Sequence, residues 1–191
     1  GVRDHDVTGV QTCALPICAR ALHNPVGALP EEVSELVRRL VEAAKKLGLT
    51  LYLVGGPVRD WLLERKVADI DLLIAGGSEE TPELLARKVA GSQTRIREHR
   101  RFGTLTVSVG EYDVDLARMR REEYAHHGAL PKVSEGSLEE DLLRRDFSVN
   151  ALLFPLLGME KIAAGSEDND STNSVIDIVG GLTDLDRKSV G

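Results

Sequence analysis

The sequence predicts one domain of the α/β or α+β class, in which helices flank a mixed sheet. Three observations support this prediction. Apolar residues recur at helical spacing after Pro30, and several short apolar runs bounded by glycine are typical of strands. The 191 residues are 42% hydrophobic, which is enough to bury a core, and only 4% aromatic, so we expect a core of Leu, Val, Ile and Ala.

The N-terminal half alternates between helical and strand-like segments. Pro30 and the two glutamates after it suit the first turn of a helix, and Gly48 ends the apolar pattern. The glycines at 55–56 separate a short strand from a short helix, and Gly110 suits a hairpin turn. We therefore expect helices at 30–47, 57–65 and 82–90, and strands at 49–54, 68–76, 94–99, 102–109 and 112–119.

The C-terminal half is less regular. Residues 121–136 lack periodicity and are expected to form a mobile loop. Ser137 and Glu140 form an S-x-x-E capping box, which predicts the start of a helix. The stretch 165–174 has the composition of a polar linker, and residues 175–179 indicate a last short strand.

The formal net charge of −7 argues against non-specific coating of nucleic acid, because such binding depends on Lys and Arg neutralising phosphates. Two groups of arginines are nevertheless clustered along the chain. A local basic groove and solvated strand ends explain these groups equally well. They are Arg95, Arg97, Arg100 and Arg101, and then Arg118, Arg120 and Arg121.

Cys13 and Cys18 are the only cysteines, so no second pair is present to complete a zinc site. A disulfide framework is not supported, and we expect a reducing, cytoplasmic environment. No apolar run approaches the length that spans a bilayer, so no membrane partner is expected. The oligomeric state is left open.

The two ends of the chain differ from the rest. Residues 1–18 show neither helical nor strand periodicity and look like translated adapter sequence, and residues 187–191 have the same look. We interpret both ends as non-native and expect the folded domain to span residues 19–186.

The first candidate functional feature is the junction of a strand, Gly55-Gly56 and a helix. Glycine lets the backbone approach a ligand, and the free N–H groups of a helix start suit a phosphate. Arg59, one turn further on, is placed to reach the same phosphates. Taken alone, the glycine pair is more typical of a tight turn.

The second feature is Asp69-Ile70-Asp71 in a predicted strand. Alternation places both carboxylates on one face and Ile70 in the core. Neighbouring carboxylates raise each other's pKa unless a cation lies between them, and carboxylate oxygens suit Mg²⁺. An isolated D-x-D is more typical of solvent-facing acids at a strand end.

Asp113 and Asp115 repeat this spacing. If their strand lies beside the first, Asp115 supplies a third carboxylate to a two-metal site, in which the ions are about 3.5–4 Å apart. Asp113 is expected in solvent, because it is nearer the hairpin.

The third feature is the segment DLLRRDFSVNA. The planar forks of its arginines suit bidentate contacts with phosphate, although Asp141 with Arg144 or Arg145 also has the spacing of an ordinary helix ion pair. The polar members of the segment are Asp141, Arg144, Arg145, Asp146 and Asn150.

Several motifs in fixed order then resemble one family. VGGPVRDWLL, DIDLLIAG, RFGTLTV, YDVDLARMR and SLEEDLLRRDFSVNALLF are similar to the head-domain motifs of class II CCA-adding enzymes and bacterial poly(A) polymerases, and VIDIVGGLTDL to the segment that closes that head. The resemblance covers residues 49–186. It implies the nucleotidyltransferase fold of DNA polymerase β, with a mixed, mainly antiparallel sheet.

The resemblance also implies a role for individual residues. Asp69 and Asp71 match the metal-binding catalytic pair, and Asp115 stands where the family often has Glu. Departures are few: Pro57 replaces a small residue, and Ser148 replaces Thr. The residues that match the nucleotide-binding motifs are Gly55, Gly56, Arg59, Asp141, Arg144, Arg145, Asp146 and Asn150.

The implied activity is transfer of a nucleotide from CTP or ATP to the 3′-hydroxyl of an RNA, expected to be tRNA, with two Mg²⁺ ions and release of pyrophosphate. A poly(A) polymerase, or a non-catalytic nucleotide-binding or regulatory module with the same fold, is the alternative. In the family, a neck domain that selects the base follows the head. It is not included in these 191 residues, so we expect weak nucleotide binding and little ordered turnover from this chain.

Overall fold

The computed structural model describes residues 25–67, 69–99, 103–123, 132–156 and 174–189. The N-terminal stretch 1–18, which we interpret as non-native, lies outside these residues. Nearly all of the predicted linker at 165–174 does so as well. In chain order the elements are η1 (Pro25–Ala28), α2 (Glu31–Lys46), β1 (Thr50–Val54), α3 (Gly56–Leu62), β2 (Ile70–Ala75), α4 (Thr81–Val89), β3 (Thr94–His99), β4 (Thr104–Val109), β5 (Tyr112–Arg118), β6 (Arg120–Glu123), β7 (Lys132–Glu135), α5 (Leu138–Leu143), η3 (Ser148–Asn150), β8 (Leu153–Pro155) and α7 (Gly181–Ser189).

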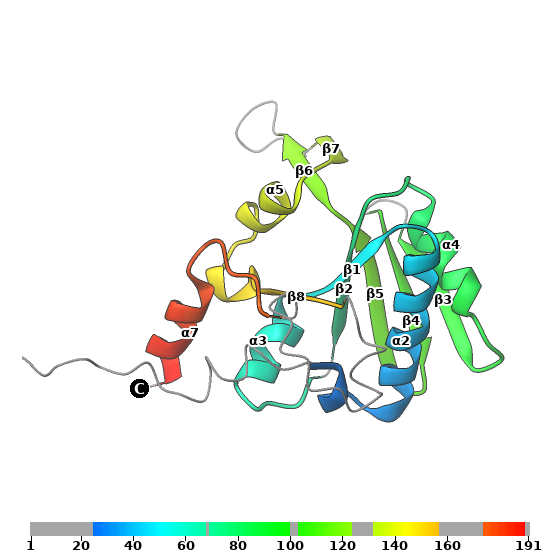
Figure 1. Cartoon of the computed structure of the whole chain (residues 1–191), viewed down its shortest axis with the longest axis horizontal. Coiled ribbons are helices and arrows are strands. Elements are labelled where there is room, and N and C mark those ends of the chain that lie inside the picture. The colour runs from blue at the N-terminus through cyan, green and yellow to red at the C-terminus, as the bar shows by residue number, and fades with distance from the viewer. Residues whose placement is uncertain (1–24, 68, 100–102, 124–131, 157–173, 190–191) are drawn as a thin grey trace, which may run out of the picture.

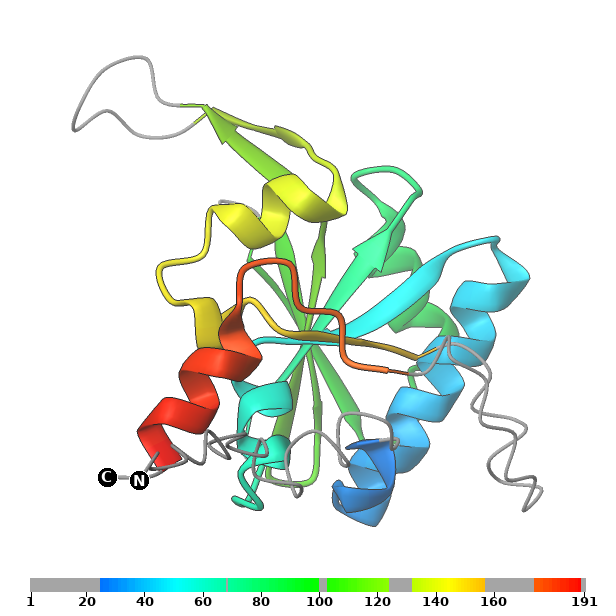
Figure 2. The ribbon, with the colours of Figure 1, turned by 60° about the vertical axis from the view of Figure 1, so that its left-hand side comes forward.

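Six strands form the main sheet in the order β3-β4-β5-β2-β1-β8. Strands β2 and β5 are parallel, and every other neighbouring pair in this sheet is antiparallel. The expected α+β class and the mixed, mainly antiparallel sheet are therefore confirmed. Helices α2 and α4 lie on one side of the sheet, as Figures 1 and 2 show.

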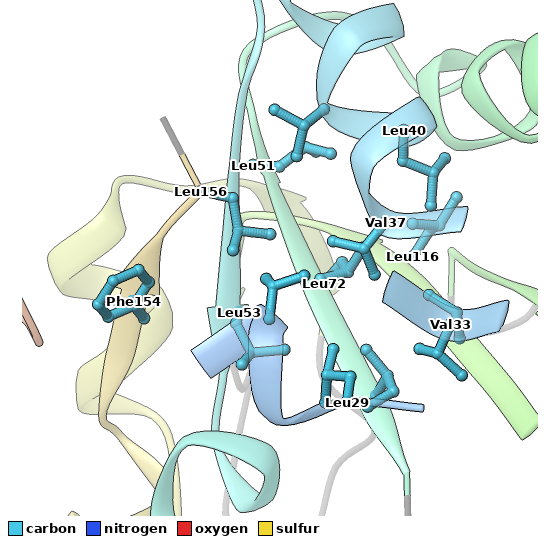
Figure 3. Close-up of a cluster of buried hydrophobic side chains, with 14 of the residues drawn as sticks. Leu29, Val33, Val37, Leu40, Leu51, Leu53, Leu72, Leu116, Phe154 and Leu156 are labelled. Carbon is cyan, nitrogen blue, oxygen red and sulfur yellow. The ribbon is translucent and has the colours of Figure 1, made fainter. Parts of the chain in front are cut away.

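Helix α2 follows the predicted pattern closely. Glu31 and Glu32 occupy its first turn, Lys45 and Lys46 its last, and both pairs oppose the partial charges of the helix ends. Its apolar residues recur every three or four positions and are buried against the sheet, where a fully buried aliphatic side chain contributes about 1.5–3 kcal/mol relative to an exposed one. Figure 3 shows Val37 of this helix beside Leu72 and Leu116 of the sheet.

The other face of the sheet carries a smaller apolar cluster. Leu73 of β2 packs there with residues from β1, α5 and the segment around η3. Because side chains alternate along a strand, Asp71 shares this face with Leu73. Asp71 is half-buried and Asp115 is exposed, so the smaller cluster leaves the candidate carboxylates accessible. The cluster consists of Val54, Leu73, Met119, Leu142, Ala151 and Leu153.

The prediction of a loop over 121–136 was wrong at both ends. Strands β6 and β7 pair as an antiparallel ribbon in which Arg120 lies opposite Glu135. Residues 124–131, between these strands, lie outside the described residues. The sequence of β6 is RREE, so it carries no apolar alternation, and its pairing rests on backbone hydrogen bonds.

The last predicted strand, at 175–179, is reduced to one bridge between Ile176 and Leu153. It ends there because the Asp177 carboxylate accepts backbone N–H groups from residues 179–182 and turns the chain into α7. Residues 187–189 belong to the C-terminal end that we interpret as non-native, and their backbone continues this helix to Ser189. Within the described residues, no helix has both the length and the apolar character needed to cross a membrane.

Candidate active site

Two of the candidate carboxylates meet across the parallel strands. Asp71 of β2 pairs in register with Asp115 of β5, so their side chains project from the same face of the sheet. Ile70 points to the opposite face and is almost completely buried. The predicted alternation is therefore confirmed for Ile70 and Asp71, whereas Asp69 precedes the strand, and the parallel pairing places Asp115 beside Asp71.

The Asp71 carboxyl has a raised pKa. Burial is the largest cause, the negative charge of Asp115 the next, and Asp69 adds a smaller effect, whereas Arg145 opposes the shift. Asp69, directly before β2, is exposed. The charges of Asp115 and Asp69 therefore both act on Asp71, and this repulsion favours a bound cation.

Asp113 is exposed, as the sequence predicted. It accepts a hydrogen bond from Ser108 at 2.5 Å and pairs with Arg97 at 3.6 Å. Asp115 accepts a hydrogen bond from the buried Thr106 at 2.5 Å. Thr106 was missed by the sequence analysis, and only the pairing of β4 with β5 reveals its position opposite Asp115.

The glycine turn approaches these carboxylates closely. Gly55 has φ 77° and ψ −131°, a conformation that side chains disfavour, and it is the N-cap of α3. A Cβ atom at this position would lie 3.4 Å from Arg145 Nη1, 3.4 Å from the Asn150 carbonyl oxygen and 4.0 Å from Asp71 Oδ2. The turn therefore brings the backbone against the acidic and basic side chains of the site.

A hydrogen bond between Arg59 and Asn150 joins two segments that are 91 positions apart in the chain. The Arg59 Nη1 group donates to Asn150 Oδ1 at 2.9 Å, while its Nε and Nη2 groups donate to the two carboxylate oxygens of Asp60, also at 2.9 Å. The hydrogen bonds to Asp60 raise the pKa of Arg59. Asp60 holds the guanidinium in one orientation, a role that the sequence analysis missed although Asp60 directly follows Arg59.

Arg144 and Arg145 are held by a single buried carboxylate. Asp141 is fully buried, accepts from Arg144 Nη2 at 2.6 Å through one oxygen, and accepts from Arg145 Nη2 at 3.0 Å through the other. The backbone N–H of Arg120 also donates to it, at 3.3 Å. Glu122 of β6 accepts from Arg144 Nη1 at 3.3 Å, so the ribbon and the two arginines form one network.

This geometry follows from the end of helix α5. The expected capping box is confirmed, because Ser137 and Glu140 exchange both hydrogen bonds. The helix ends at Leu143, so the two arginines stand at its C-terminus, within reach of Asp141. Asp146 is exposed and has no hydrogen-bond or ion-pair partner among the described residues, so it stands apart from the cluster.

The second group of arginines does not form a free basic groove. Arg118 pairs with Glu135 at 3.3 Å, and Arg121 pairs with Glu140 at 3.4 Å. Arg120 pairs with Glu122 at 3.3 Å. In the first group, Arg100 and Arg101 lie outside the described residues.

The chemistry of the donor set fits a divalent cation. Carboxylate oxygens are the ligands that Mg²⁺ prefers, and the repulsion around Asp71 is relieved by positive charge. The buried Nε atom of Arg145 has no hydrogen-bond partner among the described residues, as expected where a ligand oxygen approaches the guanidinium. In the described part of the chain, no three acidic, histidine or cysteine side chains already have metal-ligand spacing, so the carboxylates would have to turn toward a bound ion.

A separate cavity of about 460 Å³ lies between the N-terminus of α4, the far end of β5 and the ribbon. Glu80, Ala117, Arg118 and Ser134 are among the residues that line it. None of the candidate site residues lines this cavity, so the cavity is separate from the carboxylates and the glycine turn.

Fold and site together define the class. Opposed carboxylates on parallel strands, a glycine turn at a helix start and two anchored arginines are typical of proteins that bind nucleotide phosphates through a cation. The chain belongs to the poly A polymerase head domain family, which matches residues 51–191. The resemblance seen in the sequence is thereby confirmed.

Relatives in this family are similar over most of the chain. An A-adding tRNA nucleotidyltransferase of Aquifex aeolicus is 38% identical over 142 residues, which cover 74% of this chain and 16% of the relative. A CC-adding tRNA nucleotidyltransferase of Deinococcus radiodurans is 38% identical over 142 residues, which cover 73% and 34%. The chain therefore spans about a sixth to a third of the length of these relatives.

Solved structures confirm the nucleotidyltransferase fold. An apo form of a CCA-adding enzyme has a TM-score of 0.66 at 27% identity and covers 88% of this chain and 36% of its own. A tRNA nucleotidyltransferase complexed with a primer tRNA and an incoming ATP analog has a TM-score of 0.55 at 32% identity, covering 76% and 36%.

Proposed function

We propose that this chain is the catalytic head of a tRNA nucleotidyltransferase. The reaction is the transfer of a nucleotide from CTP or ATP to the 3′-hydroxyl of an RNA, with tRNA as the substrate, and pyrophosphate leaves. The observation that carries this proposal is the register of Asp71 with Asp115 beside the Gly55 turn. The A-adding and CC-adding activities in the names of the relatives support it, and we infer the cytoplasm as its location from the sparse cysteines.

The triphosphate is expected at the glycine turn. The backbone N–H groups at the start of α3 and the guanidinium groups of Arg59 and Arg145 provide donors on one side of the carboxylates. Positioning and charge stabilisation do most of the work in phosphoryl and nucleotidyl transfer, so fixed arginines are the contribution that such a site needs.

Asp69, Asp71 and Asp115 are the residues that would hold Mg²⁺. Two such ions would lower the pKa of the attacking hydroxyl and neutralise the charge of the leaving pyrophosphate. Thr106 orients the Asp115 carboxylate through its hydrogen bond, which leaves the second oxygen of Asp115 for a ligand.

Asp141 acts by positioning the arginines. Its carboxylate is fully buried and already accepts hydrogen bonds from Arg144, Arg145 and the Arg120 backbone. We infer that it orients Arg145 toward the triphosphate and does not itself contact the nucleotide, whereas Asn150 acts through Arg59.

The test is a titration of the chain with MgATP and MgCTP by calorimetry, beside the double variant Asp69→Ala/Asp71→Ala. Asp113→Ala is the matched control, because Asp113 has the same spacing but pairs with Ser108 and Arg97. We expect binding that requires Mg²⁺ and both aspartates and that survives in the control. Binding that is unchanged in the double variant would contradict the proposal.

Turnover is measured separately, with tRNA lacking its 3′ end and with oligoadenylate as primers. Extension of the tRNA supports a tRNA nucleotidyltransferase, and extension of oligoadenylate alone supports a poly(A) polymerase. Mg²⁺-dependent binding with no extension of either primer, even when the chain is joined to the downstream segment of a relative, supports a non-catalytic nucleotide-binding module.

A further inference from the structure

A side-chain hydrogen bond connects the turn that carries Asn150 to helix α7. Ser148, the first residue of η3, donates its hydroxyl to Asp184 Oδ2 of α7 at 2.5 Å. The two residues are 36 positions apart in the chain, so this bond joins separate segments. Neither residue belongs to the carboxylate or arginine sets of the site.

The start and the packing of helix α7 fix the position of Asp184. Asp177 Oδ1 accepts the N–H groups of Val179, Gly180 and Gly181, and Oδ2 accepts that of Leu182 at 2.9 Å, which fixes the start of the helix. Leu185, one residue after Asp184, is buried in the main core. The position of the Asp184 carboxylate is thus set by packing and by the helix cap.

The contact between α7 and η3 is also close in the backbone. A Cβ atom at Gly181 would collide with the Ser148 carbonyl oxygen, so only glycine fits there. The same carbonyl accepts the N–H of Ala151 at 3.0 Å, which closes the turn around Asn150. Figure 2 shows α7 lying directly beside this turn.

Asn150 links the turn to both arginines of the proposed phosphate site. Its Oδ1 atom accepts from Arg59 Nη1 at 2.9 Å, and its carbonyl oxygen accepts from Arg145 Nη1 at 3.5 Å. A shift of η3 therefore moves the acceptors of both guanidinium groups together. The side-chain bond from Ser148 to Asp184 opposes such a shift.

We propose that Ser148 and Asp184 are positioning residues for nucleotide binding, which act by fixing the Asn150 turn and, through it, Arg59 and Arg145. This inference rests on the proposed function, because it assigns the two arginines to the triphosphate. The hydroxyl of Ser148 makes the hydrogen bond to Asp184. We therefore expect Ser148→Thr to keep nucleotide affinity and Ser148→Ala to reduce it.

The experiment is a calorimetric MgATP titration of the whole chain and of Ser148→Ala, Ser148→Thr and Asp184→Asn. We expect Ser148→Ala to weaken affinity about three- to tenfold, the range of one lost hydrogen bond, and Ser148→Thr to retain it. Asp184→Asn keeps an acceptor oxygen and is expected to weaken affinity by less. Ser34→Ala is the matched control, because Ser34 donates its buried hydroxyl to the Val26 carbonyl, away from the site.

A double-mutant cycle with Asn150→Ala separates positioning from general destabilisation. If Ser148 acts through Asn150, Ser148→Ala causes a smaller loss of affinity in the Asn150→Ala background than in the wild type, because the side-chain route to Arg59 is gone and only the backbone carbonyl contact with Arg145 remains, while its effect on the melting temperature persists. Three results would overturn this inference and leave the proposed function standing. Ser148→Ala could bind with wild-type affinity, or Ser34→Ala could lose as much affinity as Ser148→Ala. The third is that Ser148→Ala loses as much affinity in the Asn150→Ala background as it does alone. A wild-type chain that neither binds nor transfers nucleotide overturns the proposed function, and the inference with it.

Discussion

Asp71 and Asp115 lie directly opposite each other on adjacent parallel strands, and burial together with the charge of Asp115 raises the pKa of Asp71. The repulsion between these carboxylates is a cost to the folded protein at neutral pH. A site that bears this cost is suited to a cation, since the ion removes the repulsion when it binds.

Replacing Asp71 with Asn is expected to stabilise the protein at neutral pH. The pKa of Asp71 is raised by folding, so the unfolded chain releases this proton at lower pH than the native protein does, and stability falls as pH rises between the two pKa values. Asn has no carboxyl group to ionise, so Asp71→Asn removes this loss of stability. Melting temperatures measured from pH 3 to 8 should show Asp71→Asn above wild type at neutral pH, with the gain vanishing at acid pH.

Asp113→Asn is the control for this experiment, because Asp113 is exposed and already has Ser108 and Arg97 as partners. No gain at neutral pH is expected from it. A melting temperature of Asp71→Asn below that of wild type at pH 7 would show that the ionised carboxylate stabilises the fold.

Mg²⁺ is expected to stabilise the wild-type chain. At ten times the dissociation constant, ligand binding to the native state adds about 1.4 kcal/mol to the free energy of unfolding. This gain should be absent from Asp71→Asn, because the site has lost a charged ligand. Denaturant titrations with and without MgCl₂, at ionic strength matched with KCl, measure the difference. An equal gain in both proteins would place the ion elsewhere.

Gly55→Ala is expected to destabilise the fold by about 1–3 kcal/mol and to abolish nucleotide binding. The φ of 77° strains any side chain, and the new Cβ atom would crowd Arg145 and the Asn150 carbonyl. Gly48→Ala separates the two effects. Gly48 has a similar φ of 68° but no atom within 4 Å of a new Cβ, so it should lose stability and keep nucleotide affinity.

Asp141→Ala is expected to lower the free energy of unfolding by about 3–5 kcal/mol, because it leaves Arg144 and Arg145 without their buried counter-charge. Glu83→Ala removes an exposed ion pair with Arg87 and should cost about 0.3–0.5 kcal/mol. Equilibrium unfolding in urea compares the two. If Asp141→Ala unfolded no more easily than Glu83→Ala, the buried network would be unimportant for stability.

Local patterns predicted the elements well where one face of the element is buried. Helix α2 was recognised from its apolar spacing and β5 from alternation, because burial of one face imposes a period on the sequence. Strand β2 is buried on both faces and was recognised as a short apolar run instead. The ribbon of β6 and β7 was missed for the opposite reason. The charged sequence of β6 has no apolar face, and pairing between backbones leaves no period to detect.

For the candidate site, the sequence by itself determined the chemical groups and their local placement. It put Ile70 and Asp71 on opposite faces of a strand and glycine before a helix, because these relations depend only on neighbouring residues. The tertiary structure alone decided that Asp115 lies opposite Asp71, that Asp141 is buried beneath two arginines and that Ser148 reaches Asp184. Each of these contacts joins separate elements, and its geometry depends on strand order and packing, which local spacing does not encode.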